Sequence, residues 1–147
     1  MDRRIFLVTP LALIAARVAR AETVKLGNLV ISHPWCPPSV KEAAAMFVEL
    51  RNDGPRPDRL IGASTPVAGT MILRSRDGAA LDHYDLLPKR PVSLRPGRRY
   101  IALRELKRPL ALDDTFPVTL RFAEAGSVTV TVTVEAGPED DPPGNPG

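Results

Sequence analysis

The sequence predicts a single all-β domain, a β-sandwich or β-barrel of about eight short antiparallel strands. Three observations support this fold class. Short runs that alternate apolar with polar residues, or that are rich in β-branched residues, follow one another between residues 24 and 134, and a period of two residues buries one face of each run. Gly, Pro, Asn and Asp separate these runs, as turns between strands require. The length of 147 residues suits one compact domain.

The expected strands can be placed one by one from these runs. They cover residues 24–31, 44–51, 59–63, 70–74, 81–87, 98–103, 117–122 and 128–134. The last of them alternates Val and Thr throughout, which is typical of a strand with one buried face. Before the second strand, Ser39 and Glu42 form a capping box that favours helix, so we expect a loop or one helical turn there.

The N-terminal segment 1–21 has the features of an export signal. Arg3 and Arg4 provide a positive start, and the apolar run 5–16 is too short for a comfortable membrane span. A small-x-small site ends at Ala21, which predicts Glu22 as the mature N-terminus. The arginine pair also fits the twin-arginine route, and the general export route remains the alternative. We therefore expect a periplasmic protein with no stable membrane span after cleavage.

Two further segments complete the expected organisation of the chain. Residues 22–136 form the β-domain, and residues 137–147, which contain Pro, Gly and acidic residues without an apolar anchor, are predicted to be a disordered tail.

Composition excludes several classes of function. Residues 1–21 hold four of the 20 basic residues and one of the 17 acidic residues, so the rest of the chain is neutral and has no electrostatic basis for binding nucleic acid. The single cysteine excludes an intrachain disulfide. No nucleophile elbow and no glycine-rich phosphate loop occurs in the sequence. We therefore do not expect an enzyme.

Few side chains can serve as ligands for a soft metal. His33 and Cys36, three residues apart, could bind Cu(I), or they could end a strand with the thiol as an inert small side chain. His83 is either a ligand or a solvated, hydrogen-bonded imidazole. Met71 is either a thioether ligand or a core residue.

Several segments, taken in order, resemble the PCu(A)C family of periplasmic copper chaperones, which are small cupredoxin-like β-barrels. The resemblance covers most of residues 24–134. It rests on Ile31-Ser32-His33-Pro34-Trp35, on residues 58–69 (DRLIGASTPVAG), on residues 107–110 (KRPL) and on residues 114–122 (DTFPVTLRF). It implies Cu(I) as the cargo, a role in Cu(I) trafficking toward respiratory oxidase assembly, and copper-donating or copper-accepting periplasmic proteins as partners.

The family pattern has two His-x-Met motifs as its copper ligands, and this chain departs from both. The first place reads Arg74-Ser75-Arg76, and the second reads Tyr100-Ile101-Ala102. A guanidinium stays protonated in proteins and cannot donate to copper. The usual ligands are therefore replaced at these former ligand positions.

Two interpretations follow from this departure. The chain is a copper chaperone with a rearranged site, for which the candidate ligands are His83 and Met71, followed by Cys36 and His33. Alternatively, it is a binding module of the same fold that recognises a periplasmic protein or an anion through clustered guanidinium groups. The members of that cluster are Arg74, Arg76, Arg98, Arg99 and Arg104.

Overall fold

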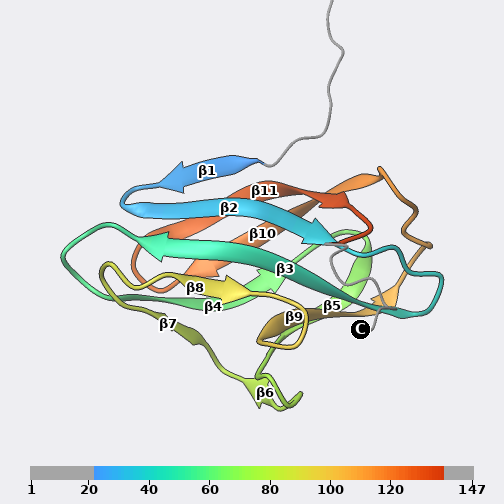
Figure 1. Ribbon diagram of the computed structural model, residues 1–147, viewed down its shortest axis with the longest axis horizontal. Helices are drawn as coiled ribbons and strands as arrows, with labels where there is room; N and C mark the ends of the chain where they lie inside the picture. The colour runs from blue at the N-terminus through green and yellow to red at the C-terminus, as the bar shows by residue number, and fades with distance from the viewer. Residues whose placement is uncertain (1–21, 138–147) are drawn as a thin grey trace, which may run out of the picture.

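The computed structural model describes residues 22–137, and within this range the chain consists of strands and connecting loops (Figure 1). The all-β class is confirmed. The predicted export signal lies outside the described residues, as does the predicted tail beyond Gly137. Within residues 22–137 there is no helix of the length and apolarity needed to span a membrane.

Eleven strands form within the described range, so the expected count of about eight was too low. In chain order they are β1 Thr23–Leu26, β2 Leu29–Cys36, β3 Ala43–Asn52, β4 Asp58–Ser64, β5 Ala68–Arg74, β6 Ala80–Leu81, β7 Tyr84–Leu86, β8 Val92–Leu94, β9 Tyr100–Leu106, β10 Thr115–Phe122 and β11 Gly126–Val134. The additional strands arise from short pieces of two and three residues, β6 to β8, and from residues 24–31, which form a hairpin and not the single strand predicted.

That hairpin joins β1 and β2. Leu26 pairs directly with Leu29, so only Gly27 and Asn28 form the turn. Gly27 has a φ of 59°, a conformation that glycine adopts without the steric cost of a side chain. Because alternation of side chains continues on both sides of so short a turn, the pattern of residues 24–31 resembles one uninterrupted strand.

Strand β2 also runs further than expected, through Cys36, where a strand-ending loop had been one prediction. Its pairing with β3 shifts register between Ser32 and Trp35, and His33 at this bulge has a φ of 52°. Beyond the bulge, Trp35 and Cys36 pair in parallel with β11. The sheet thus contains a parallel pairing, whereas the sequence predicted antiparallel strands.

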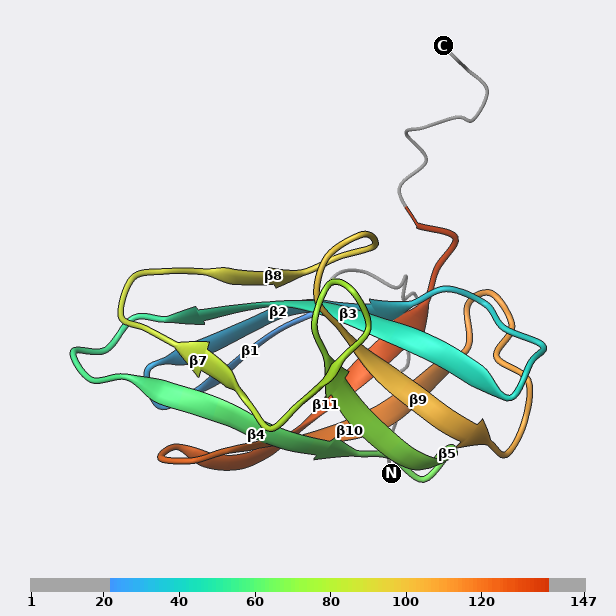
Figure 2. The same cartoon turned by 90° about the horizontal axis from the view of Figure 1, so that it is seen from below.

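The strands follow the order β6-β5-β9-β3-β2-β11-β10-β4-β7, with β1 added on β2 and β8 added on β3. Strand β4 leads into β5 through three residues, 65–67. The two ends of the strand order therefore come close together and the sheet curls into a barrel-like shape (Figure 2). Strand β3 is shared: its first half pairs with β9 and its second half with β8.

The core fills the inside of this curved sheet with alternate side chains of the long strands. Ile31, Met46, Leu60, Ile101 and Val132 are all fully buried there, and burial of such side chains is the main stabilising term of the fold. On the other face of β3, Phe47 packs on Trp35 with 5.0 Å between the ring centroids. The segment before β3 forms bends at residues 40–42, and no helical turn is present there.

Candidate functional site

The two former ligand positions come together in space. Strands β5 and β9 are antiparallel neighbours, and their register sets Arg74 opposite Tyr100 and Ile72 opposite Ala102. Since side chains alternate along a strand, these four residues share one face of the strand pair. Arg76 lies two residues beyond the end of β5, in the β5–β6 turn. The strand register therefore brings Arg74, Tyr100 and Ala102 onto one face of the β5–β9 pair.

A buried tyrosine joins the backbones at this site. The Tyr84 hydroxyl lies 2.7 Å from the carbonyl oxygen of Arg74 and 2.6 Å from that of Tyr100, and it accepts a hydrogen bond from the Arg74 N–H at 3.0 Å. Burial raises the pKa of Tyr84 to about 12, so the hydroxyl keeps the proton that these carbonyl oxygens need. Sequence reasoning missed Tyr84, although it is one of only two tyrosines in the chain.

The Arg74 side chain is held in place by the following turn. Its Nη1 donates to the Gly78 carbonyl oxygen at 3.0 Å. The turn itself closes through the Gly78 N–H, which donates to the Ser75 carbonyl oxygen at 2.9 Å, and Gly78 has a φ of 93°, which favours glycine. The guanidinium therefore has a defined position at the end of β5, with its other N–H groups available.

The five arginines of the predicted cluster are only partly brought together. The Arg99 guanidinium lies over the Tyr84 ring, with its Cζ 5.5 Å from the ring centroid, whereas Arg74 contacts the Tyr84 hydroxyl through its backbone N–H and carbonyl groups. Arg76 and Arg98 are exposed in the adjoining loops. Arg104 pairs with Thr70, four residues further along β9, or about 13 Å at the usual rise of a strand. Arg74 and Arg99 thus lie at the end of the strand pair that Tyr84 joins, and Arg104 lies at the other end of β9.

None of these five side chains forms an ion pair with an acidic residue within residues 22–137. The arginines that do so in this range are Arg51, Arg95 and Arg108. The Arg99 guanidinium over the Tyr84 ring and the Arg74 guanidinium on the Gly78 carbonyl oxygen are thus two positive charges that no acidic side chain pairs with in this part of the chain.

The four candidate copper ligands lie in different surroundings. His83 is 3.3 Å from Asp85, between Nε2 and Oδ1. Met71 shares the core-facing side of β5 with Leu73 and packs against the core, so it points away from the face of Arg74. Within residues 22–137, no contact directs the side chain of His83 or Met71 toward the position where Arg74 and Tyr100 meet.

His33 and Cys36 differ in burial: the His33 side chain is partly exposed, and the Cys36 side chain is not. The Cys36 side chain is fully buried, its Sγ donates to the Pro37 carbonyl oxygen at 3.3 Å, and burial raises the pKa of the thiol to about 12. A thiol that is protonated and enclosed in this way is a poor metal ligand. His33 instead pairs with Glu135, 3.0 Å from Nε2 to Oε1, and stacks on Trp35.

The side chains at the former ligand positions do not suit Cu(I). Arg74 offers only N–H donors, Ala102 has no donor atom, and a phenolic oxygen such as that of Tyr100 is harder than the thioether and imidazole ligands that Cu(I) prefers. Residues 22–137 also contain no cluster of three or more His, Cys, Asp or Glu side chains that could hold a metal ion.

The domain has the same fold as solved PCuAC domains. Residues 29–134 match the LpqE-like lipoprotein family, and the chain belongs to that family. None of the curated proteins matches it in sequence.

Solved structures agree with this assignment. The copper-bound PCuAC domain from PmoF2 is 28% identical, with a TM-score of 0.73, over 79% of this chain and 99% of that domain. The apo PCuAC domain from PmoF1 is 26% identical with a TM-score of 0.73, over 79% of this chain and 100% of that domain. The Cu(I)-bound DR1885 protein of Deinococcus radiodurans, at 22% identity and a TM-score of 0.61, over 71% of this chain and 77% of that protein, shares the fold.

Proposed function

We propose that this protein serves Cu(I) trafficking in the periplasm, on the route toward respiratory oxidase assembly, as a module that recognises an anionic group on a partner protein. Its place in copper handling is supported by its likeness to the copper-bound PCuAC domain. The observation that carries the recognition role is the pairing of Arg74 with Tyr100 at the former ligand positions, with Arg99 on the adjoining Tyr84 ring.

The chemistry of this site favours an anion over a cation. A guanidinium presents a planar set of N–H donors that matches a carboxylate or a phosphate, and it cannot lose its charge. A metal cation held within several ångströms of Arg74 and Arg99 would instead meet repulsion on the order of one to several kcal/mol.

Complementation of a strain that lacks the protein tests this role. Oxidase activity in copper-limited medium is measured after expression of the wild type, of the Arg74→Ala/Arg99→Ala variant, or of an Arg59→Ala/Arg121→Ala control that removes two exposed arginines from other strands. We expect the control to restore activity and the first double variant to fail. Full restoration by the Arg74→Ala/Arg99→Ala variant would contradict the role of these arginines.

A second candidate function is direct carriage of Cu(I) by a rearranged site that includes His83. His83 is the candidate because it adjoins Tyr84 in the chain and its imidazole is partly exposed, with Nε2 3.3 Å from Asp85 Oδ1. Titration of the purified protein with Cu(I) against a competing chelator separates the two candidates. Tight one-to-one binding that His83→Ala abolishes would establish carriage, whereas no measurable competition supports the recognition role.

A further inference from the structure

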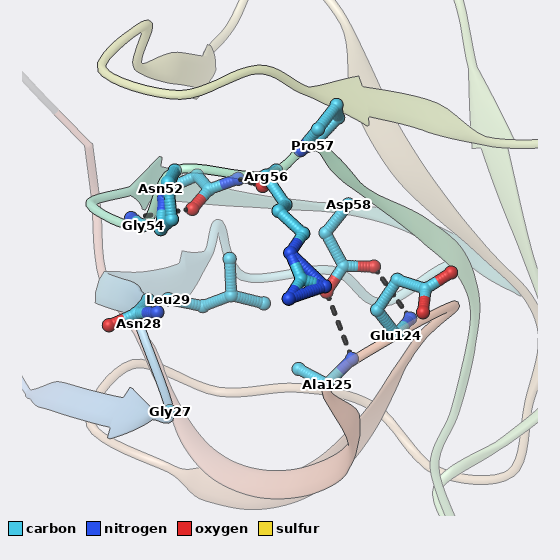
Figure 3. Close-up of a pocket in the computed structure, with 11 residues that line it drawn as sticks. Gly27, Asn28, Leu29, Asn52, Gly54, Arg56, Pro57, Asp58, Glu124 and Ala125 are labelled. Carbon is cyan, nitrogen blue, oxygen red and sulfur yellow. Dashed lines mark hydrogen bonds between the residues drawn. The ribbon is translucent and has the colours of Figure 1, made fainter.

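A separate pocket of about 600 Å³ lies where three connections of the barrel meet. Its walls come from the β1–β2 turn, the β3–β4 loop and the β10–β11 turn (Figure 3). In Figure 1 these connections gather at the end of the barrel away from β6 and β9. We propose that this pocket binds a small carboxylate, with the Arg56 guanidinium as its anchor.

Buried polar side chains fix the walls of this pocket. Asp58, 7% exposed, accepts hydrogen bonds from the N–H groups of Arg59 at 2.7 Å, Glu124 at 2.7 Å and Ala125 at 3.0 Å. It thereby ties the β3–β4 loop to the β10–β11 turn. The walls are therefore already in place before a ligand arrives, which lowers the entropic cost of binding.

Asn52 organises the loop that carries Arg56. Its Nδ2 donates to the carbonyl oxygens of Arg56 at 2.8 Å and Leu86 at 3.0 Å, and its Oδ1 accepts from the Gly54 N–H at 2.9 Å. Asn52 and Asp58 are the two buried polar residues among residues 22–137, and both line this pocket. The backbone that positions the Arg56 side chain is thus held by groups that cannot move without losing hydrogen bonds in the interior.

The Arg56 side chain points into the pocket, between Leu29 and Asp58 (Figure 3). The Asp58 carboxylate is already occupied by three backbone N–H groups. The ion pairs found within residues 22–137 do not include Arg56, and Figure 3 draws the Glu124 carboxylate on the far side of Asp58. The guanidinium therefore has donors to offer a ligand, and a carboxylate matches its planar geometry in a bidentate pair.

The rest of the lining defines the ligand further. Leu29, Pro55, Pro57 and Ala125 provide apolar surface around the single guanidinium. A pocket of this volume, with apolar walls and one charged anchor, suits a compact aliphatic carboxylate. The same chemistry is found in a free short-chain acid and in the C-terminal carboxylate of a peptide that ends in a small apolar residue.

Backbone-amide NMR titrations test this site with two probes, isovalerate and the peptide acetyl-Gly-Ala-Val with a free carboxylate. We expect saturable shifts at Gly54, Arg56 and Ala125 for at least one probe. Tighter binding of isovalerate identifies a free acid as the ligand, and tighter binding of the peptide identifies a chain terminus. Arg56→Ala should weaken binding about tenfold or more, as loss of a charge-assisted pair implies. The exposed Arg59, outside the lining, provides the Arg59→Ala control, which should bind like the wild type.

Clear negative results would overturn the proposal. They are the absence of saturable shifts with either carboxylate, equal binding of the peptide with an amidated C-terminus, and unchanged affinity of an Arg56→Ala protein whose amide spectrum shows it to be folded. Shifts confined to the Arg74 and Arg99 region would also contradict it, and would leave the function proposed above intact.

Discussion

Single side chains decide what the site can do. Tyr84 links the end of β5 to the start of β9, the Arg74 guanidinium bonds to the Gly78 carbonyl oxygen, and the Arg99 guanidinium lies over the Tyr84 ring. Guanidinium groups at such a site favour an anion over a cation. The linking hydroxyl bonds to backbone atoms of Arg74 and Tyr100, so this link does not depend on the side chains at those two positions.

Removing that hydroxyl should destabilise the domain. Tyr84→Phe leaves the partly buried carbonyl oxygens of Arg74 and Tyr100 without this donor, so we expect a loss of about 1–2 kcal/mol in the free energy of unfolding and a drop in Tm of about 2–8 °C. Thermal denaturation followed by circular dichroism measures the change. The matched control is Tyr100→Phe, which removes the same group from a half-buried side chain and should have a smaller effect. Equal losses for both variants would show that the Tyr84 hydroxyl contributes no more to stability than the hydroxyl of the half-buried Tyr100.

At the scale of elements, the connections are held by side chains from distant strands. Asp58 begins β4, yet its carboxylate organises the turn between β10 and β11. The period-two pattern marks Asp58 as an inward-facing residue of its strand, and a buried charge is tolerated only where several donors surround it.

Asp58→Asn should therefore destabilise this turn. The amide group of Asn would place N–H donors against the N–H groups of Glu124 or Ala125, so we expect a loss of about 2 kcal/mol. Chemical denaturation gives the total, and hydrogen exchange should be faster at Glu124 and Ala125. The control variant Asp82→Asn alters an exposed carboxylate and should leave both measurements unchanged. Unaltered exchange at the β10–β11 turn in Asp58→Asn would refute this role of the carboxylate.

The sequence predicts much of the strand content because alternation is a local property of the chain. The strands at residues 117–122 and 128–134 lie within β10 and β11. The hairpin at Gly27 and the short β6 and β8 were missed, because a two-residue turn or a three-residue strand leaves too little pattern to read. The site was predicted only as a set of separate positions. The meeting of Arg74, Tyr84 and Tyr100 depends on the order of strands in the sheet, which alternation alone does not specify.

For the whole molecule, two buried groups couple stability to alkaline pH. Burial raises the pKa of Cys36 from 9.0 to about 12 and that of Tyr84 from 10.0 to about 12. The folded chain therefore holds these two protons where the unfolded chain releases them. Their stabilising contribution is complete below about pH 9 and is lost as the pH rises toward about 12.

Urea unfolding at several pH values between about 7 and 11.5 should show this decline in the free energy of unfolding. The Cys36→Ala/Tyr84→Phe variant is less stable at pH 7 but should lose less stability as the pH rises. An identical slope in the variant and the wild type would mean that other groups cause the decline.

The parallel pairing of β2 with β11 has a consequence for how the domain is assembled. Trp35 pairs with Thr133, so this joint connects residues from opposite ends of the described chain. Contacts between residues so far apart in sequence form slowly, because the chain loses the entropy of closing a long loop before the stabilising contacts form. The domain therefore cannot complete its sheet until residue 134 has been synthesised. We accordingly expect the last strand to control the speed of folding and a chain that stops before it to remain open at β2.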